Sequence, residues 1–159
     1  MATTLQVSQV LGQTIVETFP TADLPSASSA SITHNQFNSS TTLNATSTPP
    51  ASMKYCDTLT GTTHLDLTAL ADPLGTVDGT GLKVQSLLVN NLSTTDALVI
   101  SDGAANEYAL NAAADITVAI GGSVLMYFND QLADISATAK TIDFTPAAGK
   151  SYEVSIVMG

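Results

Sequence analysis

"KTIDFTPAAGKSYEVSIVM", residues 140–158, is the stretch that decides the fold. Apolar and polar side chains alternate in its second half, where one face collects Tyr152, Val154, Ile156 and Met158. This alternation has the two-residue period of a β-strand with one buried face. The turn PAAGK at 146–150 separates this segment from a second candidate strand, KTIDFT. The stretch therefore predicts two short strands joined by a turn.

The same pattern continues upstream to about residue 54. Glycine-rich or Asp-Gly turns at 102–106 and 121–122 punctuate it, and 71–81 (ADPLGTVDGTG) is expected to be a loop. The alanine runs at 104–105 and 112–114 could form helical turns. The further candidate strands are THLDLTAL (63–70), LKVQSLLVNN (82–91), DALVIS (96–101), EYAL (107–110), DITVAI (115–120), SVLMYFND (123–130) and ADIS (133–136). About eight short strands with such turns predict an all-β protein, a β-sandwich or jelly-roll-like domain over 54–159.

Residues 1–53 lack this regularity and are predicted to be an extended N-terminal arm. The apolar residues of 1–19 fit neither strand nor helix period well, so a strand, a short helix and a docking arm all remain open. Residues 20–53 are rich in Ser, Thr and Asn, and alone they bury too little apolar surface to offset the entropy of ordering. They form either a flexible linker or an extended segment ordered by a surface. Three dispersed apolar residues favour the second choice as anchors for a partner: Ile32, Phe37 and Leu43.

The charge of the chain excludes several classes of partner. Four Lys, no Arg and fourteen acidic residues give a formal net charge of −10. Nucleic acids and anionic membranes are recognised by clustered cations, which this chain lacks. The N-terminus has no basic segment followed by an apolar run, and no stretch is long and apolar enough to span a membrane. We therefore expect a soluble protein made in a cytoplasm, with no nucleic-acid or membrane partner.

No catalytic or metal-binding motif stands out. Cys56 is the single cysteine, which precludes an intrachain disulfide, and it is expected to be buried or incidental. The only histidines are His34 and His64, too few for the usual zinc site. No G-x-S-x-G motif is present, and the Gly-rich segment 75–81 matches neither phosphate-binding spacing. The sequence predicts no enzyme and no cofactor.

Two weaker binding possibilities remain open. The nearby carboxylates Asp57, Asp66, Asp72 and Asp78 could supply oxygen ligands for calcium, although their spacing is not that of an EF-hand. His64, Asp66 and another carboxylate would have to converge in a pocket for acid–base chemistry.

A carbohydrate-binding surface usually exposes aromatic rings, and the candidates for stacking are Tyr108, Tyr127 and Phe128. Core packing explains these three aromatics equally well.

Three segments carry a resemblance: "LTGTTHLDLTALADPLGTVDGTGLKVQSLLVNN" (59–91), "DITVAIGGSVLMYFNDQLADISATAKTIDFT" (115–145) and "YEVSIVMG" (152–159). Their pattern resembles the small β-sandwich auxiliary virion proteins of tailed bacteriophages, of the capsid decoration, cement or head-fibre kind. The arm segment "THNQFNSSTTLNATSTPPASM" (33–53) is similar in style. The resemblance implies a structural role on the virion, made in the host bacterial cytoplasm, and no enzymatic activity. It also implies an oligomer, plausibly a trimer, but it transfers no functional residue.

The sequence thus supports three hypotheses. The leading one is a non-enzymatic virion component that decorates or cements a capsid through its β-domain and its arm, with the major capsid protein or other virion subunits as partners. Main-chain pairing of an arm with a sheet edge would supply affinity that depends little on side-chain identity. The alternative is a host-surface or glycan-binding module of a phage fibre or tail. The third is an enzyme, for which the sequence offers no motif.

Overall fold

The computed structural model describes residues 5–19, 30–72, 75–110 and 115–159, of which 11–19 and 30–39 are described by their backbone alone. The described residues form strands and loops without a helix, which confirms the predicted all-β class. By contacts the chain divides into two units: Val7–Thr42 is one, and Leu43–Gly159 with the first residues of the chain is the other. Each unit is described by itself below.

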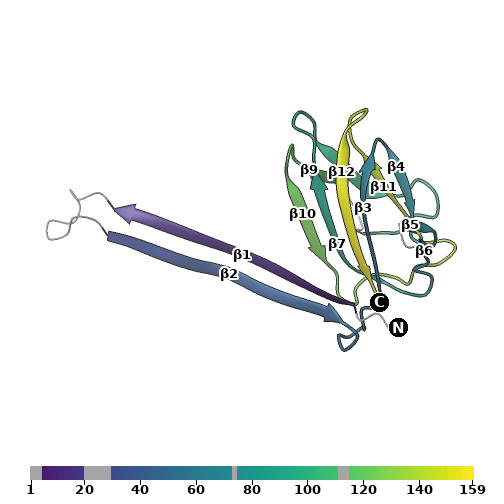
Figure 1. The fold of residues 1–159 in the computed structure, drawn as a ribbon, viewed down its shortest axis with the longest axis horizontal. Coiled ribbons are helices and arrows are strands. Elements are labelled where there is room, and N and C mark those ends of the chain that lie inside the picture. The colour runs from purple at the N-terminus through teal and green to yellow at the C-terminus, as the bar shows by residue number, and fades with distance from the viewer. Residues whose placement is uncertain (1–4, 20–29, 73–74, 111–114) are drawn as a thin grey trace. The chain divides into compact units, whose positions relative to one another are not determined.

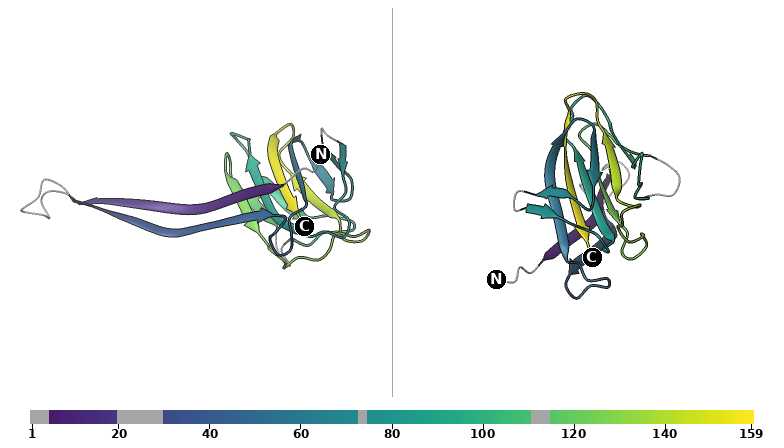
Figure 2. Two further views of the ribbon diagram at one scale, coloured as in Figure 1. Left: turned by 60° about the horizontal axis from the view of Figure 1, so that its bottom comes forward. Right: turned by 90° about the vertical axis from the view of Figure 1, so that its right-hand side faces the viewer.

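The larger unit contains two four-stranded antiparallel sheets (Figures 1 and 2). The first sheet has the order β10-β7-β12-β3 and the second β4-β11-β8-β9. Their bounds are β3 Met53–Thr60, β4 Thr63–Asp66, β7 Val84–Asn91, β8 Leu98–Asp102, β9 Ile116–Val118, β10 Ser123–Tyr127, β11 Thr141–Thr145 and β12 Ser151–Met158. β12 lies inside its sheet, between β7 and β3, so the C-terminal strand is fully paired.

The pairing of these strands is nested. The first strand pairs with the last, β3 with β12, and the pairs that follow inward are β4 with β11, β7 with β10 and β8 with β9. Two further pairings, β7 with β12 and β8 with β11, join these hairpin-like pairs into the two sheets. An eight-stranded double sheet with this nested order is a jelly roll. The structure therefore confirms the predicted β-sandwich or jelly-roll-like domain.

The core lies between the two sheets. As the alternation in the final strand predicts, Tyr152, Val154, Ile156 and Met158 are buried. Ile142 and Phe144 reach the same core from the facing sheet, and the ring of Phe144 stacks on that of Tyr152 with centroids 5.3 Å apart. Aromatic pairs in this offset arrangement add to the stabilisation from area burial. The two halves of the opening sequence segment thus meet in the core, one from each sheet.

Some predicted elements differ in the structure. The segment 71–81, expected to be a loop, contributes to a short hairpin of β5 (Leu70–Asp72) and β6 (Gly75–Val77). EYAL and ADIS are not strands; each contributes only an isolated bridge, at Glu107 and at Ser136. Tyr108 instead leaves the sheet pattern to fill the core, where its hydroxyl donates to Ala133 O at 2.7 Å.

The segment from Leu43 to Ser52 makes its contacts with the jelly roll. Leu43 and Ala51 are buried, and Ser52 N donates to Met158 O at 2.9 Å. Gln85 Nε2 also donates to Pro49 O at 2.7 Å. By these contacts the β-domain begins at Leu43, before the pattern change that marks residue 54 in the sequence.

The smaller unit is a two-stranded sheet of β1 (Gln6–Phe19) and β2 (Ala30–Asn44), called the ribbon below (Figure 1). Of the alternatives for 1–19, the structure has a strand in place of a short helix over the described residues 5–19, and the docking arm stays a prediction. In the described part of the chain each ribbon strand has a single partner, which is the other ribbon strand. Each strand therefore keeps one edge whose backbone groups are not used in a sheet.

A buried amide holds two loops of the jelly roll together. Asn91, which is 3% exposed, donates through Nδ2 to Asp96 O, Val118 O and Ala119 O at 2.9–3.3 Å, and its Oδ1 accepts from Ser93 N. The loop after β7 is thereby fixed to the loop between β9 and β10. Buried backbone groups need hydrogen-bond partners, and the side chain of Asn91 supplies them at this point.

Asn91→Ala is expected to lower the free energy of unfolding by about 1–3 kcal/mol, because it leaves buried carbonyls and an N–H without partners. Urea denaturation followed by circular dichroism measures the loss. The matched control is Asn90→Ala, whose amide makes a solvent-exposed bond to Glu153, and its effect should stay within about 0.5 kcal/mol. Equal effects of the two substitutions would contradict the role given to Asn91.

Candidate functional site

The three predicted partner-binding residues fall in different parts of the structure. Ile32 and Phe37 lie on β2, where the side chains are outside the described part of the chain. Leu43 is 1% exposed and belongs with the larger unit. Its side chain is therefore buried within the chain itself and does not offer a surface anchor in this conformation.

His64 and Asp143 form a hydrogen-bonded pair on neighbouring strands. His64 Nδ1 lies 2.8 Å from Asp143 Oδ1, and the other carboxylate oxygen accepts from Ala104 N at 3.2 Å. A hollow of about 260 Å³ lies beside them, also lined by Ala105 and Thr141. The Thr141 hydroxyl is already used, since it donates to the carbonyls of Ala105 and Asn106.

The order of residues across this sheet does not assemble a catalytic relay. In register, Asp143 lies between His64 on β4 and Ser101 on β8. A serine relay requires the imidazole between the hydroxyl and the carboxylate, so that it can take the hydroxyl proton. Here the carboxylate occupies the middle position. The pair serves instead to tie β4 and the 103–106 loop to β11.

Cys56 lies on β3 and is exposed, so of the two expectations, a buried or an incidental cysteine, the structure excludes the first. Its Sγ is 3.2 Å from Ser155 Oγ on the adjacent strand β12. Cys56 and His64 lie on strands of different sheets, and the structure does not bring them into contact. A thiol–imidazole pair is therefore not formed by these residues.

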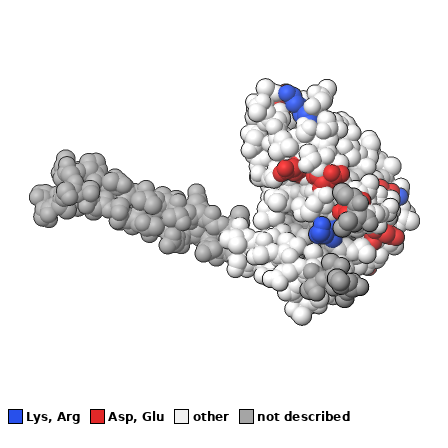
Figure 3. All heavy atoms as spheres, viewed as in Figure 1, with Lys and Arg blue, Asp and Glu red and all other residues white. Residues whose placement is uncertain are grey.

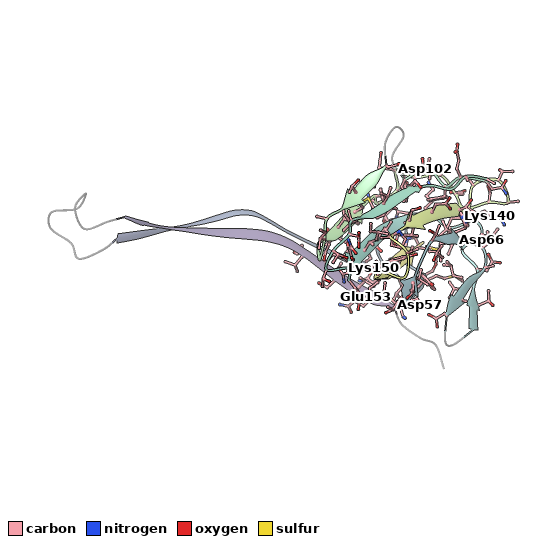
Figure 4. All side chains as sticks on the ribbon, turned by 90° about the horizontal axis from the view of Figure 1, so that it is seen from above. Asp57, Asp66, Asp102, Lys140, Lys150 and Glu153 are labelled. Atoms are coloured by element: carbon pink, nitrogen blue, oxygen red, sulfur yellow. The ribbon has the colours of Figure 1, made fainter. Side chains whose placement is uncertain are left out.

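Two of the carboxylates considered as calcium ligands, Asp66 and Asp78, each have hydrogen-bond partners of their own. Asp66 pairs with Lys140 Nζ at 2.5 Å and accepts from Thr68, as Figure 4 shows for the first pair. Burial favours its neutral form, but these hydrogen bonds outweigh burial and hold the pKa of Asp66 below its usual value. Asp78 closes a local turn by accepting from Thr80 N and Oγ1. Across the described residues, no group of three or more His, Cys, Asp or Glu is placed to hold a metal ion.

The three aromatic residues considered for sugar stacking differ in their exposure. Tyr108 is buried in the core and Phe128 packs against it. Tyr127 on β10 is 45% exposed and remains on the surface. The structure therefore offers a single ring of the three for stacking, which falls short of an aromatic platform.

A larger hollow lies on the outer face of the β10-β7-β12-β3 sheet. Its volume is about 420 Å³, within the range of about 300–1,000 Å³ typical of small-molecule sites. Its side chains come from three adjacent strands, where alternate residues point away from the core. The outward-facing ones are Cys56 and Thr58 of β3, Leu88 and Asn90 of β7, and Glu153 and Ser155 of β12, and Asp57 and Val154 complete the lining. No motif in the sequence marks this hollow.

The charge around this hollow is sparse. Figure 3 shows the same face, where most of the visible surface is neither acidic nor basic and a small acidic area lies near the middle. Two carboxylates line the hollow, Asp57 and Glu153, and Glu153 accepts from Asn90 Nδ2 at 2.9 Å. Lys54 is exposed on β3, two residues before Cys56 on the same face. The arrangement offers hydrogen-bond donors and acceptors with an acidic bias, so it suits a ligand without negative charge.

Among the described residues there is no helix long and apolar enough to cross a membrane. Comparison with known proteins gives no family model, no curated protein and no solved structure that matches the chain.

Proposed function

We propose that the protein is a non-enzymatic structural component of a bacteriophage virion, which decorates or cements the capsid surface through subunit contacts of its β-domain and N-terminal ribbon. One observation carries this proposal: the ribbon has two strands and therefore two unpaired edges. A two-stranded sheet is marginally stable alone, and an unpaired edge is a template for another chain. The jelly roll joined to it is a fold that viral capsid proteins use.

The ribbon lacks the features that protect edge strands. Charged residues, especially Lys, and proline within the strand prevent unwanted pairing. Within β1 and β2 there is no Lys, Arg or Pro, and Glu17 is the sole acidic residue. Main-chain pairing of these edges with a neighbouring subunit would supply affinity, and many copies on a lattice would add avidity. The partners proposed are the major capsid protein, other virion subunits and further copies of this chain, with a trimer plausible from the resemblance.

Co-sedimentation with phage particles tests the proposal. The full chain is expected to travel with particles on a density gradient, while residues 43–159 alone, which omit most of the ribbon, should stay at the top. A full-length variant carrying Ser8→Lys and Ser40→Lys, two exposed positions on the ribbon strands, should also lose binding. The matched control carries Thr117→Lys and Thr145→Lys on exposed positions of the jelly roll, so it has the same net charge. The proposal is overturned if neither the full-length protein nor the control with Thr117→Lys and Thr145→Lys travels with the particles.

The alternative, a host-surface or glycan-binding module of a fibre or tail, is favoured by a different observation. Jelly rolls are also a lectin fold, and the 420 Å³ hollow offers a site for a small ligand. This alternative does not need the ribbon edges. Its prediction is ligand binding by the hollow in the absence of particles.

A further inference from the structure

We propose that the hollow on the outer face of the β10-β7-β12-β3 sheet is a binding site for a neutral saccharide, held through Glu153 and Asn90. The site is independent of the virion role, because it requires neither the ribbon nor a capsid. It is built from side chains on paired strands, which hold their positions more firmly than loops do.

Strand register places the polar groups of the hollow in rows. Asn90 on β7 is paired with Glu153 on β12, which is paired in turn with Thr58 on β3. Side chains directly opposite each other on one face are about 4.5–5.5 Å apart at Cβ. An amide, a carboxylate and a hydroxyl therefore stand side by side across three strands.

The next row supplies the apolar part of the site. Leu88 is paired with Ser155, which is paired with Cys56, and on the other side Leu88 is paired with Leu125 of β10. The two leucines form an apolar strip beside the amide–carboxylate row. A sugar ring has hydroxyls on its edge and C–H groups on its faces, so it can contact both rows together.

The hydrogen bond between Asn90 and Glu153 leaves both groups with free capacity. Asn90 Nδ2 donates to Glu153 Oε2 at 2.9 Å, which uses one of its two hydrogens. Within the described residues, Asn90 Oδ1 and Glu153 Oε1 make no hydrogen bond. A hydroxyl of a ligand can donate to the carboxylate while its neighbour accepts from the amide. Adjacent hydroxyls that both donate and accept are the defining groups of a saccharide.

Charge decides which saccharides fit. No Lys contributes to the hollow, and the chain carries a net charge of −10. Lys54 faces outward from β3 two residues before Cys56, beyond the lining of the hollow, and Lys150, just before β12, lies 3.7 Å from Asp96. A phosphate, sulfate or carboxylate on the ligand would meet two carboxylates in the lining, Asp57 and Glu153, and no cation there. The site therefore selects neutral sugars over acidic ones.

Affinity for one sugar ring should be low. The hollow is open to solvent on a sheet face, and it has leucines in place of an aromatic ring. Binding energy comes from a few hydrogen bonds that replace equally good bonds to water. Dissociation constants in the millimolar range are expected for a monosaccharide, and a lattice of many copies would raise the effective affinity.

The experiment is a titration of the full-length, isotopically labelled protein followed by its backbone amide NMR signals. The probes are the methyl glycosides of glucose, galactose, mannose and N-acetylglucosamine, with glucuronate as the acidic counterpart of glucose. At least one neutral glycoside should shift the amide signals of Thr58, Asn90, Glu153 and Ser155 in a saturable manner. Glucuronate should bind more weakly than glucose.

Two substitutions test the named groups. Glu153→Gln and Asn90→Ala should each weaken binding about tenfold, the effect of losing one hydrogen bond to a charged or amide group. Glu107→Gln is the matched control, since it makes the same chemical change at an exposed position bridged to β11 of the other sheet. It should leave the affinity unchanged.

Several outcomes would overturn the inference. One is the absence of a saturable shift with every neutral glycoside. Another is binding that survives both Glu153→Gln and Asn90→Ala, since the contact would then lie elsewhere. Tighter binding of glucuronate than of glucose would contradict the neutral class. Saturable binding of a Ser/Thr-rich peptide at the same amides, without any response to sugars, would assign the hollow to a protein partner.

Discussion

Replacing Phe144 by alanine is expected to lower the free energy of unfolding by about 3–5 kcal/mol, the cost typical of removing a buried phenyl ring. Phe144 is fully buried on β11, and its ring stacks on that of Tyr152, which belongs to β12 in the facing sheet. The substitution removes apolar area from the core and also one half of a contact that joins the two sheets. β11 is held on both sides, by β4 and by β8, so the sheet cannot close the resulting cavity fully.

Urea denaturation followed by far-ultraviolet circular dichroism measures this loss, since the chain has no Trp to report by fluorescence. The control is Thr145→Ala at the next residue, which is exposed and should change stability by no more than about 0.5 kcal/mol. Phe144→Leu should fall between the two, because it keeps most of the apolar volume. A loss below about 1 kcal/mol for Phe144→Ala would mean that the two sheets do not depend on this contact.

The strands with clear alternation were predictable from the sequence, and their partners were not. The buried face of β12 follows directly from its two-residue period. The nested order, in which β3 pairs with β12 and β4 with β11, brings together segments from opposite ends of the domain. A local pattern states which face of a strand is buried but carries no information on which strand lies beside it.

The sequence pattern did not predict the strands that contain few large apolar residues. β3 forms the edge of its sheet, where Lys54, Cys56 and Thr58 face outward and Tyr55 alone is a fully buried side chain. An edge strand needs less apolar surface than a central one, so its alternation is weak. The ribbon strands show the same effect more strongly, because a two-stranded sheet needs no continuous buried face. Their irregular apolar spacing left strand, helix and docking arm all open.

The hollow, like the nested strand order, could not be predicted from the sequence, because both depend on which strands lie side by side. Its residues come from segments around 57, 89 and 154, and strand register alone brings them together. None of these segments has a recognisable motif. Glu153 and Asn90 each read as an ordinary polar residue on the solvent side of a strand. Conversely, the residues that drew attention in the sequence, such as Asp66 and Asp78, are accounted for by an ion pair and a turn.

Raising the pH above about 10 is expected to unfold the protein cooperatively, because three of its four tyrosines are buried. Burial raises the pKa of Tyr55, and the nearby Asp57 carboxylate raises it further. Burial also raises the pKa of Tyr108, against the opposing effect of the Val84 N–H, and it raises the pKa of Tyr152. The phenolate form is therefore disfavoured at all three positions while the chain is folded.

The direction of the pH effect follows from proton binding in the two states. Below about pH 10 the tyrosines are neutral in both the folded and the unfolded chain, and their contribution to stability is complete. Above that pH the unfolded chain loses phenolic protons that the folded chain keeps, so stability falls as the pH rises toward the folded pKa values. Each tyrosine contributes about 1.4 kcal/mol per pH unit, so three together contribute about 4 kcal/mol per pH unit.

Simultaneous measurement of phenolate absorbance and far-ultraviolet circular dichroism tests this expectation. The signals of the buried tyrosines should appear together with the loss of β-structure. Tyr152→Phe should reduce the steepness of unfolding by one proton, and it is a mild change because the hydroxyl lies 3.5 Å from its partner Gly61 O. The exposed residue Tyr127 supplies the control, since Tyr127→Phe should leave the midpoint and the steepness of unfolding unchanged. Ionisation of all the tyrosines before any loss of β-structure would show that the jelly-roll core does not shield them, contrary to the burial of Tyr55, Tyr108 and Tyr152 between its sheets.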